Sequence, residues 1–346
     1  MFEQDSELFT STLMISLLRV LSPSPSLVMS TMSLLFIRAS LFRRAGFSIS
    51  NTRNRVLFSS LSSSSGSTDS RIVRFQSENG EEHFGVFTDV TQASCRIAKR
   101  SELTGKMALS DEIKNVDIIL APVDPPAIYC IGLNYVDHAA EVKMDMPKYP
   151  LVFMKPVTSL TGHNSSIVIP NVASDPPEVD YEAELAVVIG KECKNVSEKD
   201  AMSYVLGYTI ANDVTARRWQ GKRGGGQWIR GKGFDTFLPL GPFLVPKSEI
   251  SDPHNLKIRT TLNGDTVQDG TTANMFFRIE QLVSFLSQGT TLLPGSVICT
   301  GTPAGVGYTR GVYLKRGDVV SIHIDKIGTL TNSVAKEVGD SGFIEH

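Results

Sequence analysis

Alternating apolar and polar positions predict a buried β-strand near the middle of the chain. The apolar positions recur at every second residue, at Ala183, Leu185, Val187 and Ile189. Because side chains alternate across a strand, Glu182 and Glu184 project from one face, about 7 Å apart along it. A second short apolar strand over residues 207–210 follows a helix-like segment and leads to Asp213.

These acidic side chains predict a metal site. If the two strands lie near one another, the carboxylates of Glu182, Glu184 and Asp213 converge, and so much negative charge is tolerated only beside a cation. All-oxygen ligation favours Mg²⁺, with Mn²⁺ as a substitute, and disfavours Zn²⁺. The same spacing also fits two acidic residues on the solvated face of an edge strand, because E-x-E is a weak pattern by itself.

Hairpins and two helices account for much of the remaining pattern. Alternating residues flank Asn79-Gly80 and Asn263-Gly264, and both dipeptides predict hairpin turns. A capping-box pattern at Ser197 begins the helix that joins the two acidic strands. Residues 278–289 predict a longer helix with a glycine stop, and residues 316–334 predict a last hairpin. The apolar face of the longer helix comprises Ile279, Leu282, Val283, Phe285 and Leu286.

Prolines divide the folded sequence, which begins near Arg71. Pro122, Pro125 and Pro126 form a stiff linker. Residues 71–122 are therefore predicted to form a small N-terminal β subdomain, and residues 123–340 the larger domain.

A candidate acid–base pair follows a predicted strand and glycine turn. His138 and Glu141 are three residues apart, so on a helix capped by Asn134 or Asp137 they share one face. A carboxylate beside an imidazole orients the ring and keeps it basic, as proton transfer requires. The same spacing also fits a surface ion pair.

Three further stretches carry candidate ligand-binding groups. Lys155 ends an apolar strand, where it either meets an acidic substrate or extends from the surface as an ordinary lysine. Residues 221–237 predict a mobile glycine-rich loop that carries Lys222, Arg223, Arg230 and Lys232. The glycine-rich turn over residues 297–307 is expected to point backbone N–H groups and Thr302 at an anion. It matches neither nucleotide-binding glycine pattern.

Composition narrows the class of protein. The 346-residue chain has a formal net charge of −2, which gives no electrostatic case for nucleic acid or an anionic membrane. Its four cysteines are far apart, which predicts reduced, mostly buried thiols. No apolar run reaches the roughly 18 residues that a membrane span needs, so a soluble protein is expected.

The first 70 residues have a different composition. They are rich in serine and arginine, contain no lysine, and lack acidic residues between Glu7 and Asp69. This composition predicts a disordered organelle transit peptide, mitochondrial or alternatively plastid. The early acidic residues fit poorly, and a start at Met29 gives a more ordinary presequence, so residues 1–28 are either an extension or a second targeting layer. A serine-rich tail without a targeting role is the alternative.

Six motifs occur together in the order of a known family. They are N-Y-V-D-H-A-A-E, F-M-K-P, D-Y-E-A-E-L-A-V-V-I-G, N-D-V-T-A-R, G-K-G-F-D-T-F and T-G-T-P-A-G-V-G. From about Ile128 to Val334 the chain resembles the fumarylacetoacetate hydrolase family, and within it the mitochondrial type-2 domain-containing group. The resemblance implies a mixed α/β, β-rich fold, a mixed β-sandwich roll, in which residues 123–340 form the catalytic domain. It also implies a homodimer.

The resemblance assigns roles by motif. The implied ligands of Mg²⁺ or Mn²⁺ are Glu182, Glu184 and Asp213; the implied catalytic residues are His138, Glu141 and Lys155; the implied substrate-side residues are Gln220, Lys232 and Thr302. Relatives usually carry a second acid where this chain has Arg218, which affects local ion pairing and substrate preference.

The implied chemistry is that of short oxo acids. A hard dication that chelates a carboxylate and a 2-oxo group stabilises an enolate. The leading expectation is a mitochondrial oxaloacetate tautomerase that converts enol to keto, in which Lys232 or the Thr302 turn receives the distal carboxylate. The alternatives are hydrolysis of acylpyruvates, oxaloacetate decarboxylation, and a non-catalytic protein that has kept the fold.

Overall fold

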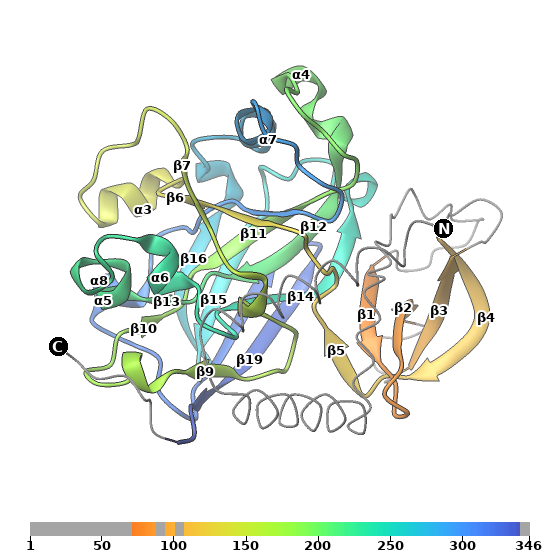
Figure 1. The fold of residues 1–346 in the computed structure, drawn as a ribbon, viewed down its shortest axis with the longest axis horizontal. Helices are drawn as coiled ribbons and strands as arrows, with labels where there is room; N and C mark the ends of the chain where they lie inside the picture. Colours follow the sequence, from red (N-terminus) through yellow and green to blue (C-terminus); the bar gives the residue numbers. More distant parts are fainter. Residues whose placement is uncertain (1–70, 88–93, 101–106, 340–346) are drawn as a thin grey trace, which may run out of the picture. The chain divides into compact units, whose positions relative to one another are not determined.

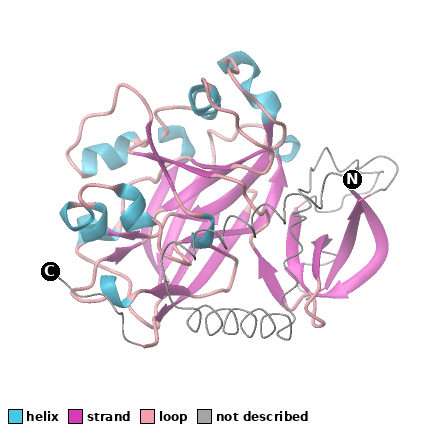
Figure 2. Cartoon of the chain, viewed as in Figure 1, coloured by secondary structure: helices cyan, strands magenta, loops and turns pink. Residues whose placement is uncertain are grey.

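The computed structural model describes residues 71–87, 94–100 and 107–339. The predictions for residues 1–70 concern residues outside these ranges. The described chain is built mainly of strands, with short helices at the ends and sides of the sheets (Figure 2). This confirms the β-rich mixed fold class.

The largest sheet contains twelve strands. They are β1 (Ile72–Gln76), β2 (Glu82–Phe87), β3 (Ser94–Arg100), β4 (Met107–Asn115), β5 (Ile118–Leu120), β6 (Ile128–Gly132), β7 (Leu151–Met154), β8 (Leu160–Thr161), β11 (Ala183–Ile189), β12 (Val205–Asn212), β14 (Leu238–Pro246) and β17 (Val297–Cys299). The order is β4-β3-β2-β1-β14-β12-β11-β17-β6-β7, with β5 beside β1 and β8 beside β14. The central strands β14, β12 and β11 lie side by side in Figure 1.

A second sheet and a two-stranded ladder complete the strands. The second sheet contains β16 (Asp265–Thr271), β15 (Lys257–Leu262), β18 (Val319–Ile324), β19 (Gly328–Lys336) and β9 (Ile167–Ile169), in that order. The ladder pairs β10 (Val179–Asp180) with β13 (Thr215–Ala216).

The main hydrophobic core lies between the two sheets. Leu185 and Val187 of β11 share this core with Ile322 and Leu330 of the second sheet. Ala186, on the other face of β11, belongs to a separate cluster with residues of β6, β14 and β17. Strand β11 is therefore buried on both faces, which explains its nearly continuous apolar sequence.

The helices are short. They are α3 (Val136–Glu141), α4 (Glu198–Ala201), α5 (Arg217–Gln220), α6 (Trp228–Lys232), α7 (Ile279–Ser287) and α8 (Gly307–Arg310). The helix start predicted at Ser197 is confirmed, because Ser197 is the N-cap residue and its side chain accepts a hydrogen bond from Asp200 N. The reciprocal half of the capping box is not formed, because the Asp200 carboxylate accepts from the Ser197 hydroxyl instead. Helix α7 confirms the prediction for residues 278–289, except that Phe285 is 39% exposed and stacks on Tyr149.

The hairpin predictions are confirmed. Strands β1 and β2, β15 and β16, and β18 and β19 pair antiparallel. Asn263 and Gly264 both have positive φ, as this tight turn requires. Strands β3, β4 and β5 occupy sequence whose pattern gave no prediction. That residues 71–122 form a separate subdomain stays a prediction. Strand β1 of this segment pairs with β14 at Ile72 and Leu244.

Two other predictions concern cysteines and membrane spans. All four cysteines are free and buried, as expected. Burial raises the pKa of the Cys95 thiol to about 12, so this thiol stays protonated at neutral pH. Within residues 71–339, leaving aside the two undescribed gaps, no helix is long and apolar enough to cross a membrane.

Candidate metal centre

Strand pairing brings the three predicted acidic residues together. Glu184 lies opposite Ala211 in the β11–β12 ladder, so both side chains project from the same face. Asp213 lies two residues beyond Ala211, and its N–H donates to Glu182 O at 2.9 Å. One carboxylate oxygen from each of Glu182, Glu184 and Asp213 lies within 4.8 Å of the others.

The alternative of a solvated edge strand is wrong. Strand β11 lies between β12 and β17. Glu182 and Glu184 are only 7% and 1% exposed, and Asp213 is fully buried. Three buried carboxylates at this separation form an all-oxygen donor set that fits a hard divalent cation such as Mg²⁺ or Mn²⁺.

The two glutamates have opposite electrostatic environments. Burial and the Asp213 charge raise the pKa of Glu184 well above its ordinary value. Burial also opposes ionisation of Glu182, but the charges of Lys232 and Arg217 outweigh it and hold its pKa at about 2. The negative charge of Glu184 is thus the one that neighbouring cations do not balance, and a bound cation would favour its ionised form.

Two lysines contact the same carboxylates. The Lys232 ammonium donates to Glu182 Oε2 at 2.8 Å, to Asp213 Oδ2 at 2.6 Å and to Thr215 Oγ1 at 2.8 Å. These contacts use all three of its protons. Lys155 donates to Asp213 Oδ1 at 2.6 Å and to Val214 O at 3.1 Å.

These contacts exclude one of the two alternatives for Lys155 and limit what Lys232 can bind. Lys155 is 3% exposed, so it is not a lysine extending from the surface, and its charge is paired with Asp213. Lys232 is equally committed, so it cannot receive a distal substrate carboxylate without giving up a protein partner. Burial alone lowers the pKa of Lys232, but Asp213 and Glu182 outweigh this effect and raise it.

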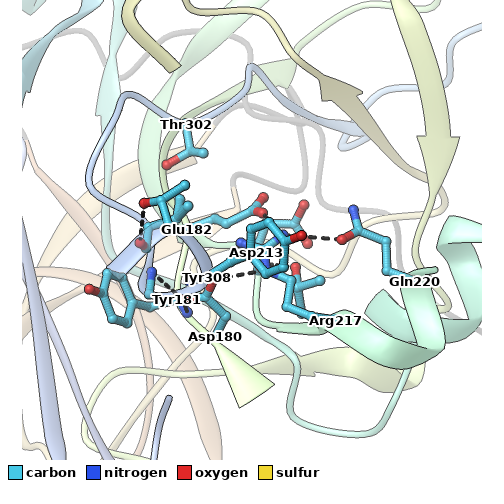
Figure 3. A network of polar contacts seen from close by, with 12 residues as sticks. Asp180, Tyr181, Glu182, Asp213, Arg217, Gln220, Thr302 and Tyr308 are labelled. Atoms are coloured by element: carbon cyan, nitrogen blue, oxygen red, sulfur yellow. Dashed lines mark hydrogen bonds and ion pairs between the residues drawn. The ribbon is translucent and has the colours of Figure 1, made fainter. Parts of the chain in front are cut away.

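An arginine connects the acidic cluster to α5. Arg217 forms an ion pair with Glu182 Oε1 at 2.6 Å and donates from Nε to Asp180 Oδ2 at 2.8 Å. It also donates to Gln220 Oε1 at 3.1 Å, so the predicted substrate-side glutamine is held by the arginine of its own helix (Figure 3). Burial lowers the pKa of Arg217, but Asp180 and Glu182 more than offset this and raise it.

Asp180 is the residue that fixes this arginine. Its fully buried carboxylate also accepts hydrogen bonds from the N–H groups of Tyr181, Gly307 and Tyr308. Neither Asp180 nor Arg217 was predicted as a site residue. Both lie inside recognised motifs, but an Asp–Arg contact across 37 residues has no signal in local spacing.

We expect Asp180→Asn to lower the free energy of unfolding by about 3–5 kcal/mol, because it leaves the buried Arg217 charge without its partner. Chemical denaturation measures this change. Asp269→Asn is the matched control, since Asp269 pairs with Arg259 at 3.1 Å but both side chains are more than half exposed. Its cost should stay below about 1 kcal/mol. Equal costs for the two variants would contradict the assigned role of Asp180.

The predicted acid–base pair is formed, and its histidine lines a cavity together with Glu182 and Glu184. His138 Nδ1 lies 3.2 Å from Glu141 Oε2, and Glu141 also accepts from Gly305 N at 3.0 Å and from Thr309 Oγ1 at 2.7 Å. The predicted side-chain caps of this helix are wrong. Tyr135 is the N-cap residue without a side-chain bond, and Asn134 instead bonds to backbone groups of Phe277 and Thr300.

The cavity has a volume of about 360 Å³. Predicted site residues on its wall are His138, Glu182, Glu184, Gln220, Lys232 and Thr302. Apolar side chains including Ile131, Met144, Trp228 and Val306 form much of the remaining wall. This size and mixed lining suit a small polar molecule held by a few groups.

Backbone N–H groups of the glycine-rich turn after β17 donate hydrogen bonds to carboxylates of the protein. Gly301 N donates to Glu184 Oε2 at 2.8 Å, and the N–H groups of Gly305 and Gly307 donate to Glu141 and Asp180. The prediction that these N–H groups point at a free anion is therefore wrong, because acidic side chains occupy them. Thr302, which was also expected to face an anion, lies on the cavity wall.

The segment after Asp213 forms short helices where a loop was predicted. Of its four predicted cations, Lys232 reaches the acidic cluster, whereas the guanidinium groups of Arg223 and Arg230 lie over the Trp219 ring. Arg218 pairs with Glu178 at 3.0 Å. The unusual arginine is thus bonded to an acid away from the three carboxylates.

The family model described as "Fumarylacetoacetate (FAA) hydrolase C-terminal" matches residues 127–335. The chain belongs to the fumarylacetoacetate hydrolase family. It is 47% identical over 250 residues to "Oxaloacetate tautomerase fahd2, mitochondrial" of Xenopus laevis, which covers 72% of this chain and 77% of that protein. The family prediction is confirmed.

Solved structures of the family share the fold. A 5-carboxymethyl-2-hydroxymuconate delta-isomerase from Mycobacterium smegmatis has a TM-score of 0.66 and 39% identity, covering 77% of this chain and 100% of that chain. A fumarylpyruvate hydrolase from Pseudomonas aeruginosa, in complex with Mn²⁺ and pyruvate, has a TM-score of 0.56 and 30% identity, covering 66% and 93%. The predicted fold of this family is confirmed.

Proposed function

We propose that this protein is a Mg²⁺-dependent oxaloacetate tautomerase that interconverts the enol and keto forms. The observation that carries the proposal is a cluster of three buried carboxylates, two of which, Glu182 and Glu184, line a cavity. His138 lines the same cavity and contacts Glu141. The similarity to an oxaloacetate tautomerase supports the choice of substrate. Mn²⁺ serves as the substitute ion, as the relative with bound Mn²⁺ suggests.

The ligands of the ion are Glu182, Glu184 and Asp213. When bound, the ion supplies positive charge that stabilises negative charge developing on the 2-oxo oxygen of the substrate. Lys155 and Lys232 hold Asp213 in position through their ammonium groups. Arg217 holds Glu182 and Gln220, and the Gln220 side chain is then directed toward the cavity.

His138 is the group that moves the proton at C3 of the substrate. It is the histidine of the described chain that lines this cavity, and Glu141 orients its ring. Lys155 was the alternative for this role. It is less suited because its ammonium is buried against Asp213 and lies behind the cavity wall.

Hydrolysis of acylpyruvates is the second candidate function. The observation that favours it is the fumarylpyruvate hydrolase whose structure resembles this chain. In that reaction the His138–Glu141 pair would take a proton from water, and the same carboxylate cluster would serve. Oxaloacetate decarboxylation would use the same groups.

Purified protein should be incubated with enol-oxaloacetate and with acetylpyruvate, each with Mg²⁺ and after chelation with EDTA. The proposal expects fast ketonisation of enol-oxaloacetate that is lost with EDTA and restored by Mg²⁺. Faster cleavage of acetylpyruvate would favour the hydrolase. Absence of metal-dependent turnover of either compound would leave only the non-catalytic alternative.

We expect His138→Gln to lower kcat by about 10²–10⁴-fold, with a much smaller change in KM, because the variant keeps polarity but removes the base. Steady-state ketonisation kinetics measure the effect. His323→Gln is the matched control, since His323 is half exposed and bonds to Thr329 in the second sheet. A His138 variant with unchanged kcat would assign the proton transfer to another group.

Location and assembly belong to the same proposal. We expect mitochondrial import directed by residues 1–70, because the similar Xenopus protein is named mitochondrial and the arginine-rich composition fits. Fusing these residues to a fluorescent protein distinguishes mitochondrion from plastid.

A homodimer is expected from the family, and the half-exposed apolar Val152 and Met154 on edge strand β7 support association. Sedimentation velocity tests it.

A further inference from the structure

One buried side chain connects the acidic strand to the turn that carries Thr302. Gln268 lies on β16 and is 1% exposed. Its Oε1 accepts from Ala183 N at 3.2 Å and from Thr260 Oγ1 at 2.8 Å. Its Nε2 donates to Thr302 Oγ1 at 2.9 Å and to Pro303 O at 3.0 Å. The amide therefore makes all four hydrogen bonds of which it is capable.

The orientation of this amide follows from its backbone partners. The Ala183 N–H can only donate, and the Pro303 carbonyl can only accept. Rotating the amide by 180° would place donor against donor and acceptor against acceptor. Ala183, the first residue of β11, lies between Glu182 and Glu184, so the same side chain contacts the backbone between two of the three acidic residues.

Close packing keeps the turn on β16. Gly305 has φ of 105°, and a Cβ at this position would lie 2.3 Å from Val267 O. A Cβ on Gly270 would lie 2.7 Å from Pro303 Cβ. The absence of side chains at both glycines lets the turn approach β16 closely enough for Gln268 to reach Thr302 and Pro303.

The Gln268 contact determines what Thr302 offers to a ligand. Because the Thr302 oxygen already accepts a proton from Nε2, its own hydroxyl proton is directed elsewhere. Thr302 lies on the wall of the cavity that contains the acidic cluster. The hydroxyl is therefore poised to donate to a ligand oxygen.

We propose that Gln268 is a positioning residue that makes Thr302 a hydrogen-bond donor toward an oxygen of the bound acid. It touches no ligand itself and acts through Thr302. This inference rests on the proposed function, because it assigns the selection of an oxygen-bearing ligand to the same cavity.

A double-mutant cycle tests the inference with Gln268→Met, Thr302→Val and their combination. Gln268→Met keeps the length of the side chain and removes its polar atoms, and Thr302→Val keeps shape and removes the hydroxyl. The readouts are KM and kcat for enol-oxaloacetate with Mg²⁺, and the Kd of malonate, an unreactive dicarboxylate, by calorimetry with Mg²⁺. Thr302→Ser is the conservative control and should resemble the wild type.

Each single variant is expected to raise KM and the malonate Kd by about 3- to 10-fold, with kcat within about twofold. When Thr302→Val is already present, Gln268→Met should change either value by less than about twofold. A purely structural role predicts the same Gln268→Met effect in both backgrounds, and that result would overturn the inference. So would a Thr302→Val variant with unchanged Kd.

The two readouts separate this inference from the proposed function. If the wild type binds malonate with the expected coupling but does not ketonise oxaloacetate, the function fails and the inference stands. If turnover is present and the effects are additive, the inference fails alone. Should Gln268→Met not fold, Gln268→Glu retains the acceptor for Ala183 but places an acceptor against both Thr302 and Pro303. Its effect on KM and on the malonate Kd must then be larger in the wild-type background than with Thr302→Val.

Discussion

Glu184→Gln is expected to reduce metal-dependent turnover by at least about 100-fold, because it removes one of the three proposed carboxylate ligands. The Mg²⁺ affinity measured by calorimetry should fall in parallel. Without metal, however, the variant should be as stable as the wild type. Burial and the Asp213 charge raise the pKa of Glu184 well above its ordinary value, so the metal-free protein already disfavours the charged form, and an uncharged amide of the same shape costs little.

The combination of these results is what identifies a metal ligand. A residue needed only for folding would lose stability together with activity. Glu192→Gln is the matched control, because Glu192 is exposed on the loop that follows the same strand. It should leave Mg²⁺ affinity, turnover and the unfolding temperature unchanged. A Glu184 variant that binds Mg²⁺ normally would exclude Glu184 from the ligand set.

The second large effect is expected from Lys232→Met. Removing the ammonium leaves the buried carboxylates of Glu182 and Asp213 without this counter-charge, which should cost about 3–5 kcal/mol of stability. Turnover should fall by about 100-fold or more, because a positioned positive charge beside the reacting groups is lost. Thermal unfolding and ketonisation rates measure the two effects.

Mg²⁺ should partly restore the stability of this variant. A dication at the same carboxylates neutralises the charge that Lys232 no longer balances, so the rise in Tm on adding Mg²⁺ should be larger than in the wild type. Lys222→Met is the control, because Lys222 is exposed in the same segment. If Mg²⁺ stabilises the Lys232 variant no more than the wild type, the ion does not bind beside Lys232.

Both predictions depend on a difference between Glu182 and Glu184 in how their negative charges are balanced. Glu182 is compensated by Lys232 and Arg217, whereas Glu184 receives a backbone hydrogen bond from Gly301. The protein thus supplies cations for Glu182, whereas the proposed ion would balance the charge of Glu184. Such an arrangement would preserve the folded site before the proposed ion binds.

Local periodicity determined several elements of the fold. The spacing of Asn263-Gly264 between alternating residues predicted a hairpin, because the turn needs two residues with positive φ and few sequences provide them. The apolar positions of β11 fixed which face carries Glu182 and Glu184. Order along the chain was enough to identify the family, since six motifs occurred together.

Other features were decided only by tertiary contacts. The sequence around Lys155 allowed either contact with an acidic substrate or an ordinary surface position. The surface position is excluded because Lys155 is buried and pairs with Asp213, which follows β12. The turn around Thr302 was expected to bind an anion, but its N–H groups are taken by side chains more than 100 residues away in sequence. Phe285 matched the apolar face of α7 and is nevertheless exposed.

The sequence by itself determined which residues could form the site, because carboxylates on alternate positions of a strand must share a face. The tertiary structure decided which charges neutralise one another. Asp180 with Arg217, and Gln268 with Thr302, meet across 37 and 34 residues. Such contacts depend on how strands pair and pack, and the free energy of a buried charge is set by those neighbours rather than by its position in the chain.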